Sequence, residues 1–492
     1  MDKNFWFSKK EKKFLKNIDT LYYAVYFEED FTKDTIHDSV KYLREFTDEV
    51  ASQEDPVNFY FKTGGTLFYQ PGRFSCYSFR LTCTDFFDMF LAPEVPTKDT
   101  PPMIIQIRSK ALWEKGVYKC VAESLEIVEQ FAKIIGLNIL EVRENRCDFA
   151  CHTNYFTHPE KFFREENFAK MWVGTVGRNY TDKTKEMLCH TSVRDDDSLE
   201  KDYIALGKRG DKCFIRLYLK TKEVVQQGYK GFFLMLWKLS GMISNYDFYV
   251  LEKAYMQKSW SYVYTARLMW ILEHGEINDD TREKINRTIE AGVYENIRSL
   301  ADKLTPAITK IYNIEFQVMR DMSKSFKLIR RNEGKYSRIY DYLDNYEMIY
   351  EYLTRVCLRL VRTDVMDLNK SRIPNIEFWD RLRSAKTVDM KHENRDIKLL
   401  REYNSNINAE LRKKRAMSAL SSYGYAMTLD PNGSLFGDAE TLLSTLNDND
   451  MWYVDEHKKK LSMRHAEGIP TNQKRKRCVS YYMFNPETGE FY

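Results

Sequence analysis

The spacing of the hydrophobic residues changes near residue 255, and this change limits the folds that the chain can adopt. Between about residues 56 and 110, short runs alternate apolar and polar residues, and glycines and prolines separate the runs. Such runs predict β-strands joined by turns. After residue 255 the apolar residues recur every three to four positions, which predicts helices. We therefore expect an α+β fold in which a mixed or antiparallel sheet is followed by an α-helical C-terminal region.

This pattern divides the chain into four segments. We predict an N-terminal helical segment, an α+β domain, a helical region and a C-terminal tail with a basic patch, over residues 1–55, 56–255, 256–428 and 429–492 respectively. Inside the second segment, residues 122–136 have helical spacing and end in Gly136, the residue type that most often follows a helix. The length of 492 residues allows one large domain or two to three ordinary ones.

The composition narrows the class of protein. Hydrophobic residues make up 43% of the chain and charged residues 30%, so the chain can bury cores and is not of a disordered type. The net charge of +4 is too small to indicate a partner. The nine cysteines form no CxxC pair, which favours reduced thiols. No apolar run reaches the roughly 18–20 residues that span a bilayer, so we expect a cytoplasmic protein without a membrane partner.

One predicted strand carries an unusual set of polar residues. It reads KCFIRLYLKTKE and spans residues 212–223. Alternate side chains of a strand point to opposite faces, so one face is apolar and the other holds Tyr218 between Arg216 and Lys220, with Glu223 just beyond. A tyrosine oxygen flanked by cations can act as a nucleophile on a phosphate group. The ordinary alternative is a half-exposed tyrosine on a solvated strand face.

A second predicted strand, NRCDFACHTNY, also has a polar face. It places Arg146, Asp148 and His152 on one side. Carboxylate and imidazole groups can hold Mg²⁺ or Mn²⁺. If the polar faces of the two strands meet in one cleft, Asp148 and His152, with Glu223, would hold the metal beside the tyrosine, as metal-assisted phosphodiester transfer requires. A solvated polar sheet face is again the alternative.

These strands, in their order along the chain, resemble a known family. DYIALGKRGDKCFIRLYLKTKE resembles the segment G-S-R-x-S-x-x-F-I-R-I-Y-x-K-x-x-E of the rolling-circle replication initiators of the Rep_trans family, which serve plasmids, phages and conjugative elements. NRCDFACHTN is similar to the family's R-I-D-x-A-x-D strand. YTARLMWILEHGEINDDTREKINRTIE and NIEFWDRLRSAK are similar to its later helices. The resemblance covers about residues 100–385.

The resemblance implies a protein that binds origin DNA and nicks and rejoins one strand. Tyr218 would become joined to the 5′-phosphate of the cut strand, and Arg216 and Lys220 would neutralise that phosphate. Asp148 would be a ligand of Mg²⁺ or Mn²⁺, together with His152 or Glu223. The implied partners are the origin duplex and single strand, a host helicase and a second copy of the chain.

One motif of the family is not matched. The family has a strand R-x-E-x-E after the tyrosine, and the best local match, LWKLSGMI at residues 236–243, has Ser240 and Met242 in the glutamate places. This leaves open an alternative, a catalytically decayed DNA-binding module of the same fold that recruits replication proteins. A structural or interaction protein without a nucleic-acid role is a third hypothesis.

Several cations are candidates for contact with DNA. We assign this role to Arg146, Lys208, Arg209, Lys212, Lys413, Lys414 and Arg415. The last three are adjacent in a predicted helix, where neighbouring cations surround the axis, so a solvated helix is the alternative. The run KRKR at residues 474–477 indicates either an exposed tail or a non-specific nucleic-acid contact.

Overall fold

A computed structural model gives the fold of most of the chain. It describes residues 11–29, 58–60, 66–70, 76–83, 85–93, 100–156, 165–177, 187–193, 199–365, 372–387, 398–401, 409–428, 432, 434–448, 450–452 and 454–458. The basic run at 474–477 lies outside these ranges. Within them, every helix is too short or too polar to cross a lipid bilayer.

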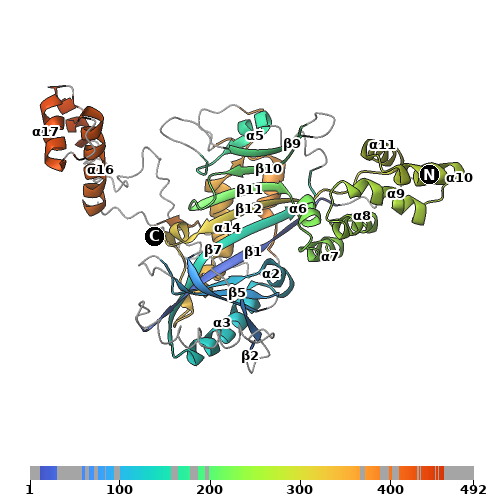
Figure 1. The fold of residues 1–492 in the computed structure, drawn as a ribbon, viewed down its shortest axis with the longest axis horizontal. Coiled ribbons are helices and arrows are strands. Elements are labelled where there is room, and N and C mark those ends of the chain that lie inside the picture. The colour runs from blue at the N-terminus through green and yellow to red at the C-terminus, as the bar shows by residue number, and fades with distance from the viewer. Residues whose placement is uncertain are drawn as a thin grey trace.

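An antiparallel sheet of eleven strands forms the centre of the molecule (Figure 1). The spatial order is β2-β3-β4-β5-β6-β1-β7-β12-β11-β10-β9, and each neighbouring pair is antiparallel. The strands are β1 (Phe14–Phe27), β2 (Asn58–Tyr60), β3 (Thr66–Gln70), β4 (Tyr77–Cys83), β5 (Phe87–Pro93), β6 (Met103–Ile107), β7 (Ile139–Thr153), β9 (Met187–Val193), β10 (Leu199–Leu206), β11 (Cys213–Leu219) and β12 (Tyr312–Met319). The predicted α+β class is confirmed, with an antiparallel sheet.

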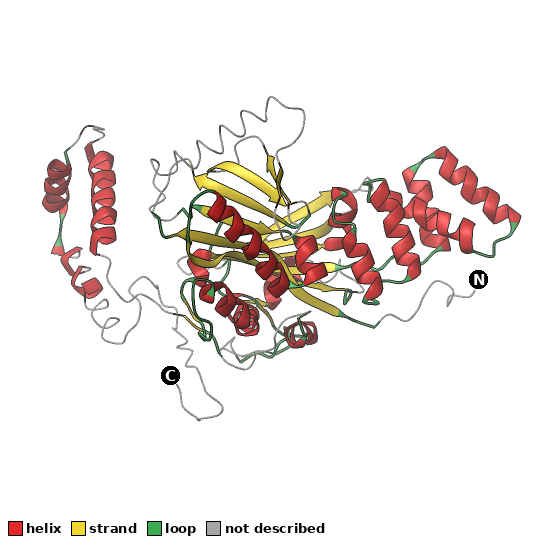
Figure 2. Ribbon diagram, turned by 90° about the horizontal axis from the view of Figure 1, so that it is seen from below, coloured by secondary structure: helices red, strands yellow, loops and turns green. Residues whose placement is uncertain are grey.

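Helices cover one face of this sheet (Figure 2). Phe149 of β7 contacts the rings of Tyr342 and Tyr346, and the Tyr23 hydroxyl of β1 donates to Ser124, 2.9 Å away. Both contacts belong to one apolar core. The helices involved are α3 (Val117–Ile134), α13 (Ser337–Asp344), α14 (Tyr346–Tyr352) and α15 (Glu377–Ser384). The polar residues of the central strands therefore lie on the opposite face.

A helical arm is inserted between β11 and β12, which are neighbours in the sheet (Figure 1). It has its own apolar core, built around Trp237, Val250 and Leu268. Ser244 and Asp247 form a capping box that begins α8. The helices of this insertion are α6 (Lys220–Gln227), α7 (Phe232–Leu239), α8 (Asn245–Met256), α9 (Tyr262–His274), α10 (Asp279–Ala291) and α11 (Tyr294–Leu304).

Shorter elements complete the described chain. The remaining helices are α2 (Ser109–Lys115), α5 (Glu165–Met171), α12 (Arg320–Ser323), η2 (Leu353–Cys357), α16 (Ala409–Thr428) and α17 (Leu435–Thr445). Two small sheets pair β13 (Phe326–Lys327) with β15 (Leu400–Arg401), and β14 (Arg359–Leu360) with β8 (Trp172–Val173). Helix α17 lies inside the segment 429–492 that was expected to be a tail.

The N-terminal prediction of helix is wrong for residues 14–27, which form the long strand β1. The reason is the break in its alternation. The pairing of β1 with β7 shifts between Ile18 and Thr20, again between Tyr22 and Tyr23, and again between Tyr26 and Phe27. The first shift adds Asp19 to β1 and offsets the two-residue period of its side chains, whereas the other two add Asn145 and Leu140 to β7. The strand is also largely buried, so its sequence lacks the apolar–polar alternation of a half-exposed strand.

The prediction that residues 256–428 are helical is wrong for β12, which spans Tyr312–Met319. This strand alternates correctly, with Asn313, Glu315 and Gln317 at every second position. It lies between helical segments and pairs with β11 across the whole inserted arm. The two paired strands lie far apart in the sequence, so the local pattern does not indicate that β12 pairs with β11.

Candidate active site

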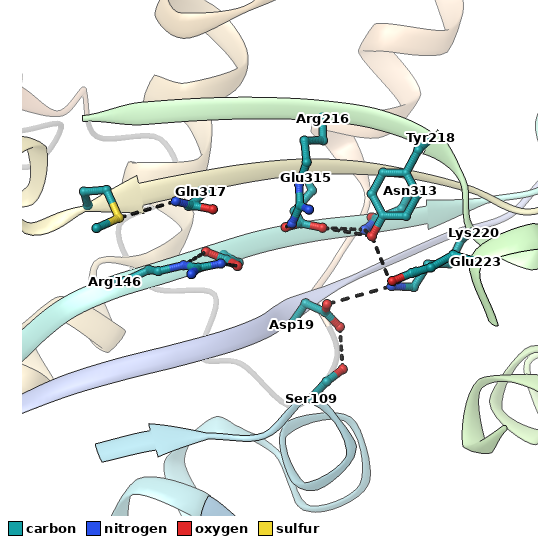
Figure 3. Close-up of polar contacts among 12 residues, drawn as sticks. Asp19, Ser109, Arg146, Arg216, Tyr218, Lys220, Glu223, Asn313, Glu315 and Gln317 are labelled. Carbon is teal, nitrogen blue, oxygen red and sulfur yellow. Dashed lines mark hydrogen bonds and ion pairs between the residues drawn. The ribbon is translucent and has the colours of Figure 1, made fainter. Parts of the chain in front are cut away.

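The polar residues of three central strands lie side by side on the open face of the sheet (Figure 3). The register pairs Tyr218 of β11 with Asn313 of β12, and Arg216 with Glu315. The same register pairs Gln317 of β12 with Asp148 of β7. The two predicted polar strand faces therefore do meet, but β12 lies between them and contributes its own carboxylate.

Tyr218 is fully hydrogen-bonded although it is buried, with 8% of its surface exposed. Its hydroxyl donates to Glu315 Oε2 at 3.0 Å. The hydroxyl oxygen of Tyr218 also accepts hydrogen bonds from Lys220 Nζ at 3.1 Å and from Asn313 Nδ2 at 3.0 Å. Burial, and then the Glu315 carboxylate, raise the pKa of Tyr218 well above its ordinary value. The resting residue is thus a neutral phenol whose proton points at a base.

The Glu315 carboxylate explains the position of Tyr218 beside a cation, because it accepts hydrogen bonds from both Tyr218 and Arg216. Its carboxylate is 1% exposed and takes a hydrogen bond from the Arg216 guanidinium on one oxygen. The other oxygen accepts from Tyr218 and, at 3.1 Å, from Asn313. Burial opposes the charge of Arg216, but the Glu315 carboxylate outweighs it and raises the pKa of Arg216. The Arg216 guanidinium therefore stays charged in this low-dielectric setting.

Lys220 joins the tyrosine to a second group of buried charges. Its ammonium is fully buried and lies 2.7 Å from Glu223 Oε2 and 4.0 Å from Asp19 Oδ2. Burial favours the neutral amine, but the carboxylates of Asp19 and Glu223 reverse the effect and raise the pKa of Lys220. Glu223 in turn binds Lys230 at 2.8 Å. Lys220 therefore remains a cation beside the phenol oxygen.

Asp19 is held by helix α2 as well as by Lys220. Ser109 Oγ and Trp113 Nε1 both donate to Asp19 Oδ1, at 2.6 and 2.8 Å. Burial would raise the pKa of Asp19, but the charge of Lys220 outweighs it and holds the pKa far below the ordinary value. Asp19 is therefore an ionised anchor for the buried lysine.

His152 does not join the predicted metal ligands. It lies under helices α2 and α7, stacked on Trp113 with ring centroids 4.8 Å apart, and its Nδ1 accepts from Trp237 Nε1 at 3.2 Å. Burial, together with the charge of Lys220, lowers its pKa well below the ordinary value. Glu223 is occupied by two lysines. Within the described part of the chain, no three His, Cys, Asp or Glu side chains form a group that could hold a metal ion.

Two carboxylates on neighbouring strands remain as candidate ligands. Asp148 is buried and accepts from Arg146 Nε and Nη2 at 2.9 and 2.5 Å. Burial raises the pKa of Asp148 to about 6, with Arg146 opposing and the negative charge of Glu315 adding to the rise. Mg²⁺ often takes one or two carboxylates, with water and substrate phosphate completing its shell. Asp148, Glu315 and Gln317 carry oxygen donors of this kind at neighbouring positions of β7 and β12, and Arg146 and Arg216 bind the two carboxylates. The predicted set is not brought together in this way, because the His152 ring is packed between tryptophans.

The predicted DNA-contacting cations fall in three places. Lys208 and Arg209 are exposed in the turn that joins β10 to β11, and Lys212 is exposed at the end of that turn. Arg146 lies in the site itself, bound to Asp148. Lys413, Lys414 and Arg415 lie on α16, where Lys413 is exposed. Their contact with DNA stays a prediction.

Sequence reasoning missed Glu315, Asn313 and Asp19. The segment 236–243, the local match to R-x-E-x-E, forms no strand: its first four residues end helix α7, and the other four are a turn. The strand beside the tyrosine is β12, which reads N-x-E-x-Q from Asn313 to Gln317. The alternating run YNIEFQVM was the available signal, but the inserted arm moves it far down the chain.

Comparison with known proteins adds a distant likeness. No family model and no curated protein matches the sequence. Among solved structures, the fold is similar to a rolling circle replication initiator protein from Geobacillus stearothermophilus. The similarity covers 76% of this chain and 100% of that chain, at 10% identity and a TM-score of 0.32.

Proposed function

We propose that the protein cuts and rejoins a single DNA strand through a covalent link to Tyr218, as an initiator of rolling-circle replication does. One observation carries the proposal: the Tyr218 hydroxyl donates to Glu315 and accepts from Lys220 and Asn313. A nucleophile bound to a base and to a fixed cation is the arrangement that activates hydroxyl groups in covalent catalysis.

The step balances without an added reagent. The Tyr218 oxygen forms a bond to phosphorus, its proton passes to Glu315, and the bond from phosphorus to the 3′-oxygen breaks. The leaving oxygen takes up a proton and becomes a free 3′-hydroxyl. The products are a 5′-phosphotyrosine and a nicked strand, and the reverse reaction rejoins the ends. Lys220 and Arg216 are placed to oppose the negative charge that builds on the phosphate oxygens.

Neighbouring residues of the chain orient Glu315 and would stabilise the phenolate of Tyr218. Glu315 is held in place by Arg216 and Asn313, so it keeps its orientation toward the phenol. Lys220 would stabilise the phenolate as it forms, because it already donates to that oxygen. When bound at Asp148, Glu315 and Gln317, Mg²⁺ or Mn²⁺ would supply further positive charge for the phosphate. Arg146 and Arg216 are partly exposed, so they have room to move from these carboxylates.

The test is a search for the covalent adduct. Single strands of random sequence, labelled at the 3′ end, are incubated with the protein and Mg²⁺ or Mn²⁺ and then denatured. The label is expected to stay with the protein, and Tyr218→Phe is expected to abolish the adduct completely, because the nucleophile is gone. Tyr203→Phe is the matched control, since Tyr203 lies directly opposite Tyr218 on β10.

The alternative of a decayed DNA-binding module gives a different result. Wild type would then form no adduct with any labelled strand, while binding DNA with an affinity that falls as salt rises. Tyr218→Phe would bind DNA as wild type does. A protein without a nucleic-acid role would show no salt-dependent binding at all.

A further inference from the structure

An arginine–tyrosine pair lies on the open face of the sheet, next to the candidate metal ligand Asp148. Tyr22 of β1 is the cross-strand neighbour of Arg146 of β7, and the Arg146 guanidinium lies over the Tyr22 ring, 5.2 Å from its centroid. The same guanidinium binds Asp148. The pair therefore extends the polar surface of the site from β7 to β1.

The Tyr22 ring is not part of an apolar core. The next residue, Tyr23, points to the opposite face and is fully buried among the core residues. Tyr22 is only half-buried, and it belongs to neither of the two apolar cores of the described chain. Aromatic rings and guanidinium groups at the surface are the groups on which the bases of a single strand stack. Tyr22 and Arg146 are thus suited to contact a base.

The turn that joins β10 to β11 lies at the same end of the sheet as Tyr22. The backbone N–H of Met319 on β12 donates to Lys212 O in this turn, at 3.0 Å. Met319 pairs with Arg146, and Arg146 pairs with Tyr22. Arg209 is exposed in the same turn. The register of the sheet therefore brings an exposed cation to the end of the face that carries Tyr22.

The charge of Arg209 acts on the open face itself. Burial raises the pKa of Tyr22 and of Tyr203, and the positive charge of Arg209 opposes the rise in both. Because one charge acts on tyrosines of both β1 and β10, its guanidinium reaches over the face between these strands. Within the described ranges, no carboxylate forms an ion pair with Arg209. Its guanidinium can therefore bind a phosphate group near the Tyr22 ring.

We propose that Tyr22 and Arg209 form a subsite for one nucleotide of the single strand, with the base stacked on Tyr22 and the phosphate bound to Arg209. The inference rests on the proposed function, because it takes a single strand to cross the open face to Tyr218. The subsite contains none of the reacting groups. Its role is to fix the path of the strand across β7 and β1.

The test measures binding rather than cleavage, in a Tyr218→Phe background that cannot form the adduct. A fluorescent oligothymidylate of about 12 nucleotides, and a strand of the same length without bases, are each titrated with the full chain at several salt concentrations. Tyr22→Leu is expected to weaken binding of the oligothymidylate by at least about five-fold, with the salt slope unchanged. It should not weaken binding of the strand without bases, because the ring contacts the base.

The arginine gives a second and independent readout. Arg209→Gln is expected to weaken binding of both strands and to reduce the salt slope by about 0.7, the value for one lost phosphate contact on a single strand. Because Arg209 is exposed in a turn, this variant cannot fail merely by unfolding. Tyr22→Phe keeps the ring and should bind both strands as the background protein does.

The matched controls are Tyr26→Leu and Arg330→Gln. Tyr26 also lies on β1 under an arginine, with Arg143 4.0 Å from its ring centroid, but it is further along the strand from Asp148. Arg330 is also exposed, but it lies in the loop before α13, on the helix-covered side of the sheet. Both controls should keep the affinity and the slope of the background protein.

Two outcomes would overturn the subsite. The first is that Tyr22→Leu and Arg209→Gln both bind the oligothymidylate as tightly as the background protein does. The second is that Tyr22→Leu weakens binding of the two strands equally, which would exclude a contact with the base.

The same variants separate this inference from the proposed function. If wild type forms no covalent adduct but the two subsite variants lose affinity as expected, the subsite stands and the cleavage proposal fails. If the adduct forms and the subsite variants bind as the background protein does, the subsite alone fails.

Discussion

The two ends of the open sheet face differ in how their positive charges are paired and exposed. Around Tyr218, the cations Arg216 and Lys220 are each matched by buried carboxylates, and the phenol oxygen is held from three sides. At the β4–β6 side, Arg80 and Arg108 share the single carboxylate of Asp88 and stay partly exposed. A buried and fully hydrogen-bonded network fixes a reacting group in one orientation, whereas the partly exposed arginines of the β4–β6 side remain in contact with solvent.

The largest effect is expected when Glu315, the proposed base at the tyrosine end, is changed. Glu315→Gln keeps the shape of the side chain but cannot take the proton of Tyr218, so the rate of adduct formation should fall by about 10²–10⁴-fold. Single-turnover kinetics with the 3′-labelled strand measure it, and oligothymidylate affinity should change little.

The control for this variant is Glu141→Gln. Glu141 is a half-buried carboxylate of β7, paired with Arg338 at 2.6 Å and away from Tyr218. It should react at the wild-type rate. A Glu315→Gln protein that also reacts at the wild-type rate would exclude Glu315 as the base.

The next effect concerns stability at the tyrosine end. Lys220→Met leaves the buried Asp19 carboxylate without this cation, so the free energy of unfolding should fall by about 3–5 kcal/mol. Denaturant titration measures it. Lys133→Met, on a side chain that is 70% exposed, should change it by less than about 0.5 kcal/mol. Equal effects for the two variants would contradict the balanced network.

The smallest effect is a dependence of stability on pH. Burial would raise the pKa of Glu223, but Lys220 and Lys230 outweigh it and hold the pKa below the ordinary value. The stabilisation is therefore present above the unfolded value of about 4.3 and is lost as pH falls through the lower folded value. Glu223→Gln should show a shallower loss of stability in acid than wild type does. An unchanged acid profile would mean that Glu223 is not ionised in the fold.

Part of the site could be predicted from local alternation. The predicted strand 212–223 placed Tyr218, Arg216 and Lys220 together, and their side chains do meet in the structure. The prediction is wrong for residues 220–223, because β11 ends at Leu219 and Lys220 begins helix α6. Alternation assigns residues to a face, but it does not say which strand lies next door. Glu315 reaches Tyr218 only through the pairing of β11 with β12 across the inserted arm. That pairing is non-local, so no window of sequence contains it.

Alternation also does not predict where helices cover the polar face of a strand. His152 lies on the same side of β7 as Asp148, which made it a reasonable candidate ligand. Trp113 of α2 and Trp237 of α7 cover the sheet at that end, so the imidazole is packed as part of a core. Which end of a strand is covered depends on the docking of helices, and the strand's own sequence does not encode it. The extra residue Asp19 likewise interrupts the two-residue period of β1.

The most direct test of the central claim is to locate the covalent bond. The denatured adduct of wild-type protein and 3′-labelled strand is digested with protease and nuclease, and the modified peptide is sequenced by mass spectrometry. The proposal predicts a nucleotide attached through its 5′-phosphate to Tyr218. Attachment to Tyr203 or to any other residue, or an adduct that persists in Tyr218→Phe, would contradict it.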